Sequence, residues 1–400
     1  MKWLIAIAAV GALLFSMPAA AAKVQTMDKI TKLPEKQDES NLWERASSHE
    51  NRLRNVGTLV SHPQIEQYLE SLADRMLGDY IDHLGIDVDF VVVEEANLSA
   101  WAYPYGTIGI QTGLIVRMDN EAQLAAIVAH EISHFLQRHT YREMLDKGKQ
   151  SFLGKGLGFL AAAALTKETG TFDPNVMDFA GDLWMNLATS GYSKKNEYVA
   201  DEEGLMLMAN AGLSRDEAIP AFHALAENKE YGAGDPRKMW SSHPRLEDRI
   251  KNLQKEIKRE KRRKTYVAGE IPDPLIYYRA IASALIVNAK LDIEEGQFGR
   301  ARDALEKYLM VHPVDPQAHF LMAEAYRRES PLGPDFAECT NSYYEALEHD
   351  SDYADAHKEL GMTYRQQHKN VEARAAFERY LALAADAPDS GIIRGYLETL

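Results

Sequence analysis

An H-E-x-x-H motif at residues 130–134 lies inside an apolar stretch, and it constrains the fold more than any other feature of the sequence. One helical turn places His130 and His134 on the same face, so both imidazoles can reach one metal ion. Two histidines on a helix are often surface residues. Residues 125–129 are apolar, however, which predicts that the motif faces inward, where ionisable groups without a partner are costly. We therefore expect a metal site, with Glu131 beside the water that the metal polarises.

The motif belongs to a helix predicted over residues 121–145. Asn120, with Gln123 three residues later, is typical of a capping pair at a helix start. Apolar residues then recur at helical spacing. Shorter apolar or alternating runs predict strands at 87–93 and 107–111. The region therefore combines helices with a small β-sheet.

Caps and apolar stripes predict the neighbouring helices. Pro63 marks one helix start, Ser193 marks another, and Gly212 ends the second helix. Ser214 and Glu217 have the spacing of a capping box that opens the next helix. Two apolar stripes at helical spacing are expected to be buried: Ile65, Leu69, Leu72 and Met76 in the first, and Leu246, Ile250, Leu253 and Ile257 in the second.

A catalytic zinc ion needs a third protein ligand and one open position. No H-x-x-G-x-x-H follows the motif and no cysteine lies near it, so a distant carboxylate is expected. Glu197 and Asp201 lie four residues apart and share a helix face. In this interpretation Glu197 binds zinc, and Asp201 accepts the outer N–H of a ligand histidine. The alternative is an acidic helix surface, which Glu202 and Glu203 would extend.

The chain changes character after a linker predicted at residues 266–274. Six residues fall at the spacings of a tetratricopeptide repeat: Leu360, Gly361, Tyr364, Ala373, Phe377 and Tyr380. An earlier unit has the same pattern with a four-residue insertion, and half of the pattern precedes it. Residues 275–400 are therefore predicted to form about three helix pairs. Cys339 falls at a small-residue packing position, so we expect a structural thiol.

The N-terminus is typical of an exported protein. Residues 1–22 have a charged start, an apolar run and an alanine-rich end, which predict a secretory signal peptide. The alternative, an uncleaved membrane anchor, needs a longer apolar stretch. Residues 23–60 are predicted to be a leader. One cysteine cannot form an internal disulfide, and together these features predict a periplasmic protein.

These motifs jointly resemble those of the family-48 metallopeptidases, the HtpX-type gluzincin group, and within it the periplasmic BepA-like branch. The residues that carry the resemblance are 130–134 with Gln137, Arg138 and His139, then 197–201, then Ser242, His243 and Pro244, and finally Arg249 and Ile250. The resemblance implies a mainly α fold, with an α+β gluzincin peptidase domain at 61–265 and an all-α tetratricopeptide-repeat domain at 275–400. It also favours Glu197 as the third ligand. Tyr105 departs from the family pattern, which usually has glycine there, and the repeat region is short.

The resemblance implies a zinc-dependent endopeptidase with one zinc ion per chain and Glu131 as the general base. It also places His243 near the metal, where three roles are open: a fourth ligand, a donor to the developing oxyanion, or a structural residue. The strand at 107–111 is expected to be an edge strand that holds an extended substrate by main-chain pairing. Such pairing selects unfolded chains.

The expected substrates are unfolded or misassembled envelope polypeptides, and the resemblance adds outer-membrane assembly machinery as a partner of the repeats. Nucleic acid is excluded as a partner because the net charge is −15, and non-specific binding needs a positive field. A second hypothesis is a chaperone or scaffold that acts through the repeats with rare, gated proteolysis. A structural zinc site fits poorly, because such sites are closed by Cys and His and would leave Glu131 without a role.

Overall fold

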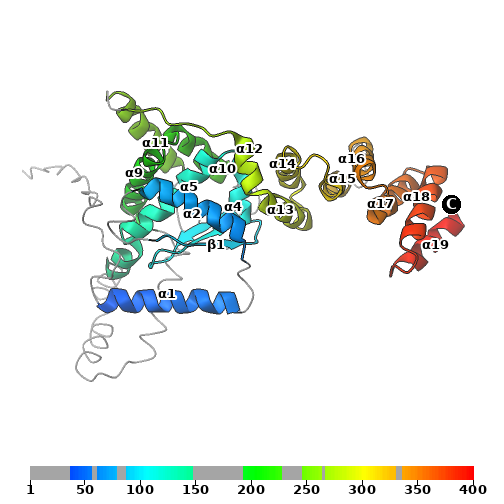
Figure 1. Ribbon diagram of the computed structural model, residues 1–400, viewed down its shortest axis with the longest axis horizontal. Coiled ribbons are helices and arrows are strands. Elements are labelled where there is room, and N and C mark those ends of the chain that lie inside the picture. Colours follow the sequence, from blue (N-terminus) through cyan, green and yellow to red (C-terminus); the bar gives the residue numbers. More distant parts are fainter. Residues whose placement is uncertain are drawn as a thin grey trace, which may run out of the picture.

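The protein is described by a computed structural model, which covers residues 37–55, 61–78, 87–146, 192–227, 246–263, 266–329 and 336–400. A helical body surrounds a small sheet, and a row of helix pairs extends from it to the C-terminus (Figure 1). The predicted fold class, mainly α with a small sheet and C-terminal helix pairs, is confirmed. The predicted signal peptide and His243 lie outside the described residues. The predicted domain boundaries stay predictions.

The sheet has three strands in the order β1-β3-β2. They are β1 (Phe90–Val93), β2 (Ala100–Ala102) and β3 (Ile108–Gln111). β1 pairs with β3 in parallel and β2 pairs with it in antiparallel fashion. Both predicted strands exist, but the expectation that residues 107–111 form an edge strand is wrong. The tight turn at Gly106, where φ is +113°, folds β2 back onto β3 and leaves β3 between two partners.

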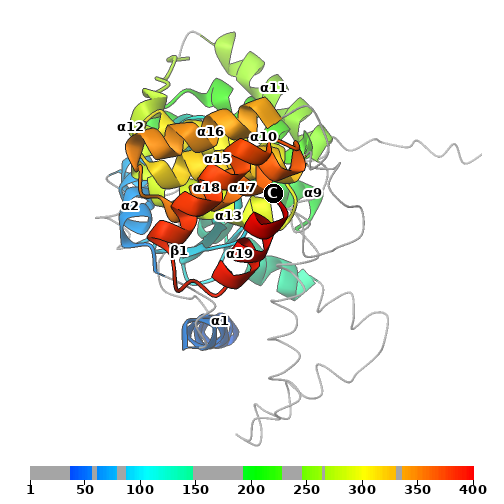
Figure 2. The ribbon, with the colours of Figure 1, turned by 90° about the vertical axis from the view of Figure 1, so that its right-hand side faces the viewer.

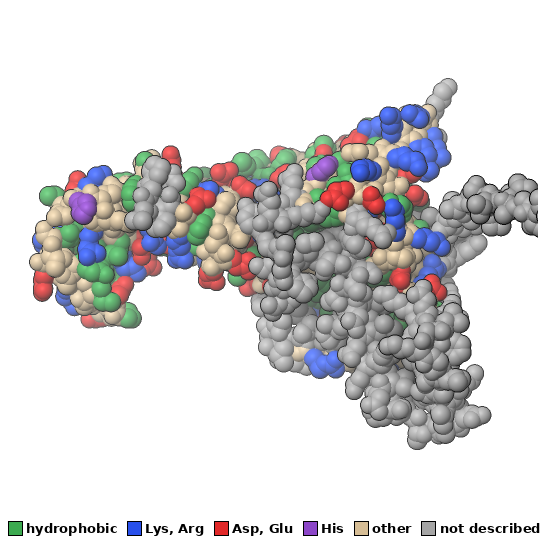
Figure 3. Space-filling model, turned by 180° about the vertical axis from the view of Figure 1, so that it is seen from behind, with side chains coloured by type: hydrophobic (Ala, Val, Ile, Leu, Met, Phe, Trp, Pro, Cys, Tyr) green, Lys and Arg blue, Asp and Glu red, His purple; other side chains and the backbone are tan. Residues whose placement is uncertain are grey.

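The helical body has six main helices: α1 (Gln37–Asn55), α2 (Pro63–Leu77), α5 (Glu121–Leu136), α9 (Lys194–Asn210), α10 (Ala218–Glu227) and α11 (Leu246–Lys261). Of these, α2 and α5 pack against the sheet, and α9 and α10 pack against α5. A short helix, α4 (Thr112–Arg117), follows β3. Both predicted stripes, on α2 and α11, are buried. Every residue of α5 is buried. Basic side chains gather at the exposed end of α11 (Figure 3), where cations complement the helix dipole.

Most of the predicted helix ends are confirmed, and one predicted capping box is wrong. The side chain of Asn120 accepts a hydrogen bond from the amide of Gln123 at 3.0 Å, as predicted. Ser193 caps α9 in the same way, and Gly212 ends it with φ at +73°. The predicted capping box at Ser214 is wrong, because Ser214 makes no such bond and a 3₁₀ turn follows it. The carboxylate of Glu217 instead accepts hydrogen bonds from the side chains of Asn120 and Gln123.

The motif helix is shorter than predicted. α5 ends at Leu136, and a separate helical stretch covers residues 139–146. Arg138 lies between them with φ at +50°, in the left-handed region that ends a helix. The helical periodicity continues across this break, which is why the sequence predicted one helix to residue 145.

The C-terminal part contains the three predicted helix pairs (Figure 2). They follow α12 (Pro274–Ala280) and are α13 (Ala282–Glu294) with α14 (Phe298–Leu309), α15 (Pro316–Glu329) with α16 (Phe336–His349), and α17 (Ala354–Gln366) with α18 (Asn370–Leu383); α19 (Ser390–Thr399) ends the row. Burial raises the pKa of Cys339 to about 11, as expected for a structural thiol. Nζ of Lys307 contacts the carbonyls of Val116 and Met118, which joins the first pair to the helical body. No helix among the described residues is long and apolar enough to cross a membrane.

Candidate metal centre

The structure brings together the three residues predicted to bind a metal. His130 and His134 lie one turn apart on α5, and Glu197 reaches them from the first turn of α9. One ligand atom from each residue lies within 4.8 Å of the other two, and all three residues are buried. The two Nε2 atoms are 2.9 Å apart, and the Glu197 carboxylate is 3.6–3.7 Å from them. Two imidazoles and one carboxylate form a donor set that suits catalytic zinc.

The buried charges around these ligands also fit a divalent cation. Glu131, Glu197 and Asp201 are at most 3% exposed, and Arg249 is fully buried beside them. These three buried carboxylates lie close to one guanidinium. Buried charge of this kind is unfavourable unless it is paired. Zn²⁺ would balance it.

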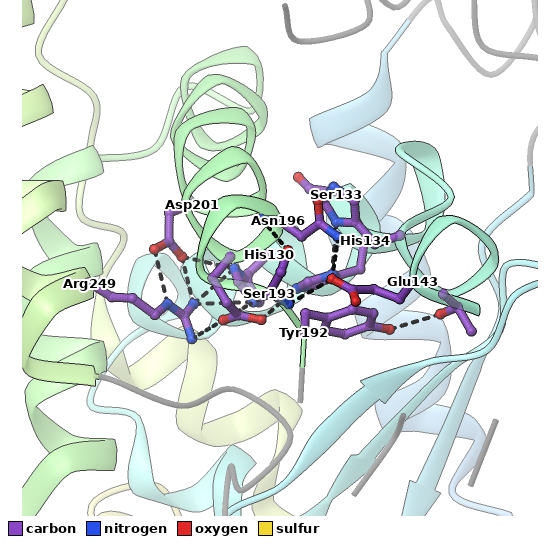
Figure 4. Close-up of polar contacts among 12 residues, drawn as sticks. His130, Ser133, His134, Glu143, Tyr192, Ser193, Asn196, Asp201 and Arg249 are labelled. Carbon is purple, nitrogen blue, oxygen red and sulfur yellow. Dashed lines mark hydrogen bonds and ion pairs between the residues drawn. The ribbon is translucent and has the colours of Figure 1, made fainter. Parts of the chain in front are cut away.

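Asp201 lies beside His130. Its Oδ1 is 2.9 Å from Nδ1 of His130, so it can accept the outer N–H of that histidine (Figure 4). Such an acceptor fixes which ring nitrogen carries the proton and which faces the metal. The alternative interpretation, an acidic helix surface, is wrong for this face of α9, because Glu197 and Asp201 are both buried.

Arg249 on α11 is among the residues that carry the family resemblance, but the sequence analysis assigned it no role. Its guanidinium makes two hydrogen bonds to Asp201, at 2.6 and 3.0 Å, and lies 2.7 Å from the Glu197 carboxylate. It also packs over the ring of Phe222 and lies 3.0 Å from Nδ1 of His130. Burial acts to lower the pKa of Arg249, but the two carboxylates outweigh it and raise that pKa. One indication of its burial was present in the sequence: Arg249 directly precedes Ile250, which belongs to the buried stripe on α11.

The helical stretch at residues 139–146 fixes the start of α9. The carboxylate of Glu143 accepts hydrogen bonds from the Ser193 amide at 2.7 Å and from the Asn196 side chain at 2.8 Å (Figure 4). Ser193 itself caps the helix. Since Glu197 lies in the first turn of α9, these contacts set the position of the third ligand relative to the motif.

His139 and Tyr192 both contact His134. Nδ1 of His139 is 3.0 Å from Nδ1 of His134, and the ring of Tyr192 stacks on His134 with centroids 3.9 Å apart. The Tyr192 hydroxyl bonds to Thr140 at 2.9 Å. Burial raises the pKa of Tyr192, so its phenol stays neutral.

Comparison with known proteins points to one family. Residues 36–257 match the family model described as peptidase family M48. A relative in Vibrio cholerae serotype O1 is 28% identical over 244 residues, which are 60% of this chain and 48% of that protein. The Beta-barrel assembly-enhancing protease of Escherichia coli K12 is 27% identical over 50% of this chain and 40% of that protein. Metalloprotease LoiP of the same organism is 27% identical over 48% of this chain and 71% of that protein. The chain thus spans less than half the length of the first two relatives.

Replacement of Arg249 tests the charge balance. Arg249→Met leaves Glu197 and Asp201 buried without their cation, so the free energy of unfolding should fall by about 3–5 kcal/mol. Chemical denaturation of the metal-free protein measures this change. Lys251→Met, at an exposed position two residues later, is the control and should change it little. A loss no larger than that of the control would contradict the role of Arg249.

Glu203 gives a pH-dependent prediction. It is 1% exposed, accepts a hydrogen bond from Gln137, and burial raises its pKa from 4.5 to about 7. The folded state therefore holds this proton more tightly than the unfolded state, and stability is lost as the pH rises from about 4.5 to 7. Glu203→Gln should stabilise the protein by on the order of 1–3 kcal/mol at pH 8 and little at pH 4.5.

Denaturation curves at the two pH values test this prediction. Glu202→Gln, at the half-buried neighbouring position, should have a smaller effect. Equal gains from Glu203→Gln at both pH values would show that the carboxylate does not titrate in this range.

Proposed function

The chain belongs to peptidase family M48, and from this membership and its metal-ligand set we propose that it is a zinc-dependent endopeptidase. The observation that carries the proposal is the buried His130, His134 and Glu197 group, with Glu131 next to the first histidine on the same helix. A structural metal site would not need this additional buried carboxylate.

The chain's own residues supply the steps of peptide hydrolysis. His130, His134 and Glu197 would hold zinc, which when bound lowers the pKa of water and polarises the scissile carbonyl. Glu131 takes the proton from the attacking water and passes it to the leaving amine. Asp201 keeps His130 oriented, and Arg249 keeps Asp201 and Glu197 charged and in place. His243, as a fourth ligand or an oxyanion donor, stays a prediction.

β2 takes the place of residues 107–111 as the proposed strand that pairs with substrate. The Ser99 carbonyl accepts a hydrogen bond from the Gln111 amide of β3 at 2.9 Å, and the Tyr103 amide donates one to the carbonyl of Thr107, just before β3, at 2.8 Å. Alternation along an antiparallel pair then turns the main-chain groups of Ala100 and Ala102 away from β3. Ala100 and Ala102 are only 1% and 6% exposed, so an extended polypeptide that pairs with this side of β2 would first have to uncover it. Folded proteins rarely offer such a segment.

The proposed setting is the periplasm, with unfolded or misassembled envelope polypeptides as substrates. The name of the E. coli relative, Beta-barrel assembly-enhancing protease, supports a link to β-barrel assembly, and the predicted signal peptide supports export. In this proposal the helix pairs of residues 275–400 contact the client or the outer-membrane assembly machinery. The competing hypothesis, a scaffold that acts through these repeats with rare proteolysis, differs in one testable respect: it does not require Glu131.

Glu131→Gln tests the proposed chemistry. The amide cannot accept a proton, so cleavage of unfolded casein should fall by about 10²–10⁴-fold while zinc content stays near one per chain. A chelator should abolish the wild-type activity. Retained cleavage in Glu131→Gln would exclude Glu131 as the general base. A biological effect that survives in Glu131→Gln would favour the scaffold.

Ala102→Pro tests the strand. Proline removes only the N–H that points away from β3, and position 102 is extended, so the sheet should remain. Loss of one substrate hydrogen bond should lower kcat/KM on casein by about tenfold. Ala102→Ser keeps the N–H and serves as the control. Equal activity in both variants would exclude pairing at this position.

A further inference from the structure

We propose that His139 is the hydrogen-bond acceptor that orients His134 towards the metal. This inference rests on the proposed function, because it concerns how the chain presents one of the zinc ligands. His139 would be a positioning residue, which acts through His134 and does not touch the metal or the substrate.

The geometry assigns the roles of the ring nitrogens. Nε2 of His134 faces Nε2 of His130 at 2.9 Å and the Glu197 carboxylate at 3.6 Å, so Nε2 is the atom that would bind the metal. A neutral histidine that binds through Nε2 carries its proton on Nδ1. That proton needs an acceptor, and Nδ1 of His139 lies 3.0 Å away. His139 then carries its own proton on Nε2.

The backbone places His139 for this contact. In a continued α-helix a residue five positions after His134 would lie roughly 140° around the axis and could not reach it. Arg138 is left-handed, and its amide bonds back to the Phe135 carbonyl at 2.9 Å. An ion pair at 2.8 Å joins its side chain to the buried Glu39 of α1. This turn returns the chain, so His139 faces His134 and is only 1% exposed.

The stacked ring of Tyr192 cannot replace His139 in this role. Stacking fixes the plane of the His134 ring, but a ring face offers no strong acceptor in the plane of the N–H. Tyr192 therefore leaves open which nitrogen of His134 carries the proton. The hydrogen bond to His139 decides it.

Charge explains why this acceptor is an imidazole. His130 already uses a carboxylate, Asp201, which is neutralised in part by Arg249. Glu131, Glu197 and Asp201 already lie buried around the ligands. A second carboxylate behind His134 would add another buried negative charge, which is unfavourable unless it is paired. A neutral imidazole orients the ligand without that cost.

The test is the zinc affinity of the full chain, measured by competition with a chromophoric chelator. His139→Leu removes the acceptor and should weaken zinc binding by about 10–100-fold. In His139→Asn the amide oxygen stands as many bonds from the backbone as Nδ1 does. This variant should bind within about threefold of wild type, since an acceptor is retained. His223→Leu, at an exposed histidine on α10, is the matched control and should not change the affinity.

The outcomes separate this inference from the proposed function. Wild-type affinity in His139→Leu, or equal weakening in His139→Leu and His139→Asn, would overturn the role of His139 alone. Absence of tight zinc binding in the wild type would overturn the proposed function and this inference with it. If His139→Leu does not fold, His139→Gln replaces it, because its acceptor is one bond further out. Weaker binding than in His139→Asn would then support the inference.

Discussion

Buried negative charge is the constraint on which the packing of the peptidase region depends. Glu131, Glu197 and Asp201 lie on α5 and α9 with almost no exposure, and each such charge is unfavourable by several kcal/mol unless it is paired. Arg249 supplies one positive charge, which requires α11 to pack against α9. A divalent cation bound by His130, His134 and Glu197 would add further positive charge. This balance explains how α5 carries an H-E-x-x-H motif and is still buried along its whole length.

The second organising element is the stretch at residues 139–146, which begins with the left-handed turn at Arg138. His139 contacts His134, Thr140 holds the Tyr192 ring against the same ligand, and Glu143 anchors the start of α9. One short segment therefore joins the end of the motif helix to the helix that carries the third ligand. α9 and this segment support the ligands from different sides.

The sequence predicted the parts of this site that follow from local spacing. His130 with His134, and Glu197 with Asp201, are both four-residue pairs on helices whose caps could be recognised. The role of Arg249 could not be assigned from spacing, because a charged residue in a helix as polar as α11 normally faces solvent. The left-handed turn at Arg138 contains no glycine, so the sequence did not indicate it. The position of β2 depends on which strands pair, and the sequence of a three-residue strand does not indicate its pairing partner.

X-ray diffraction at the zinc absorption edge, from crystals of the zinc-loaded chain, tests the central claim most directly. The account predicts one anomalous peak per chain, at about 2.0–2.2 Å from Nε2 of His130, Nε2 of His134 and a carboxylate oxygen of Glu197. The same map would show whether His139 stays behind His134. No peak at this position, or a peak held by other residues, would contradict the assignment of a catalytic zinc site.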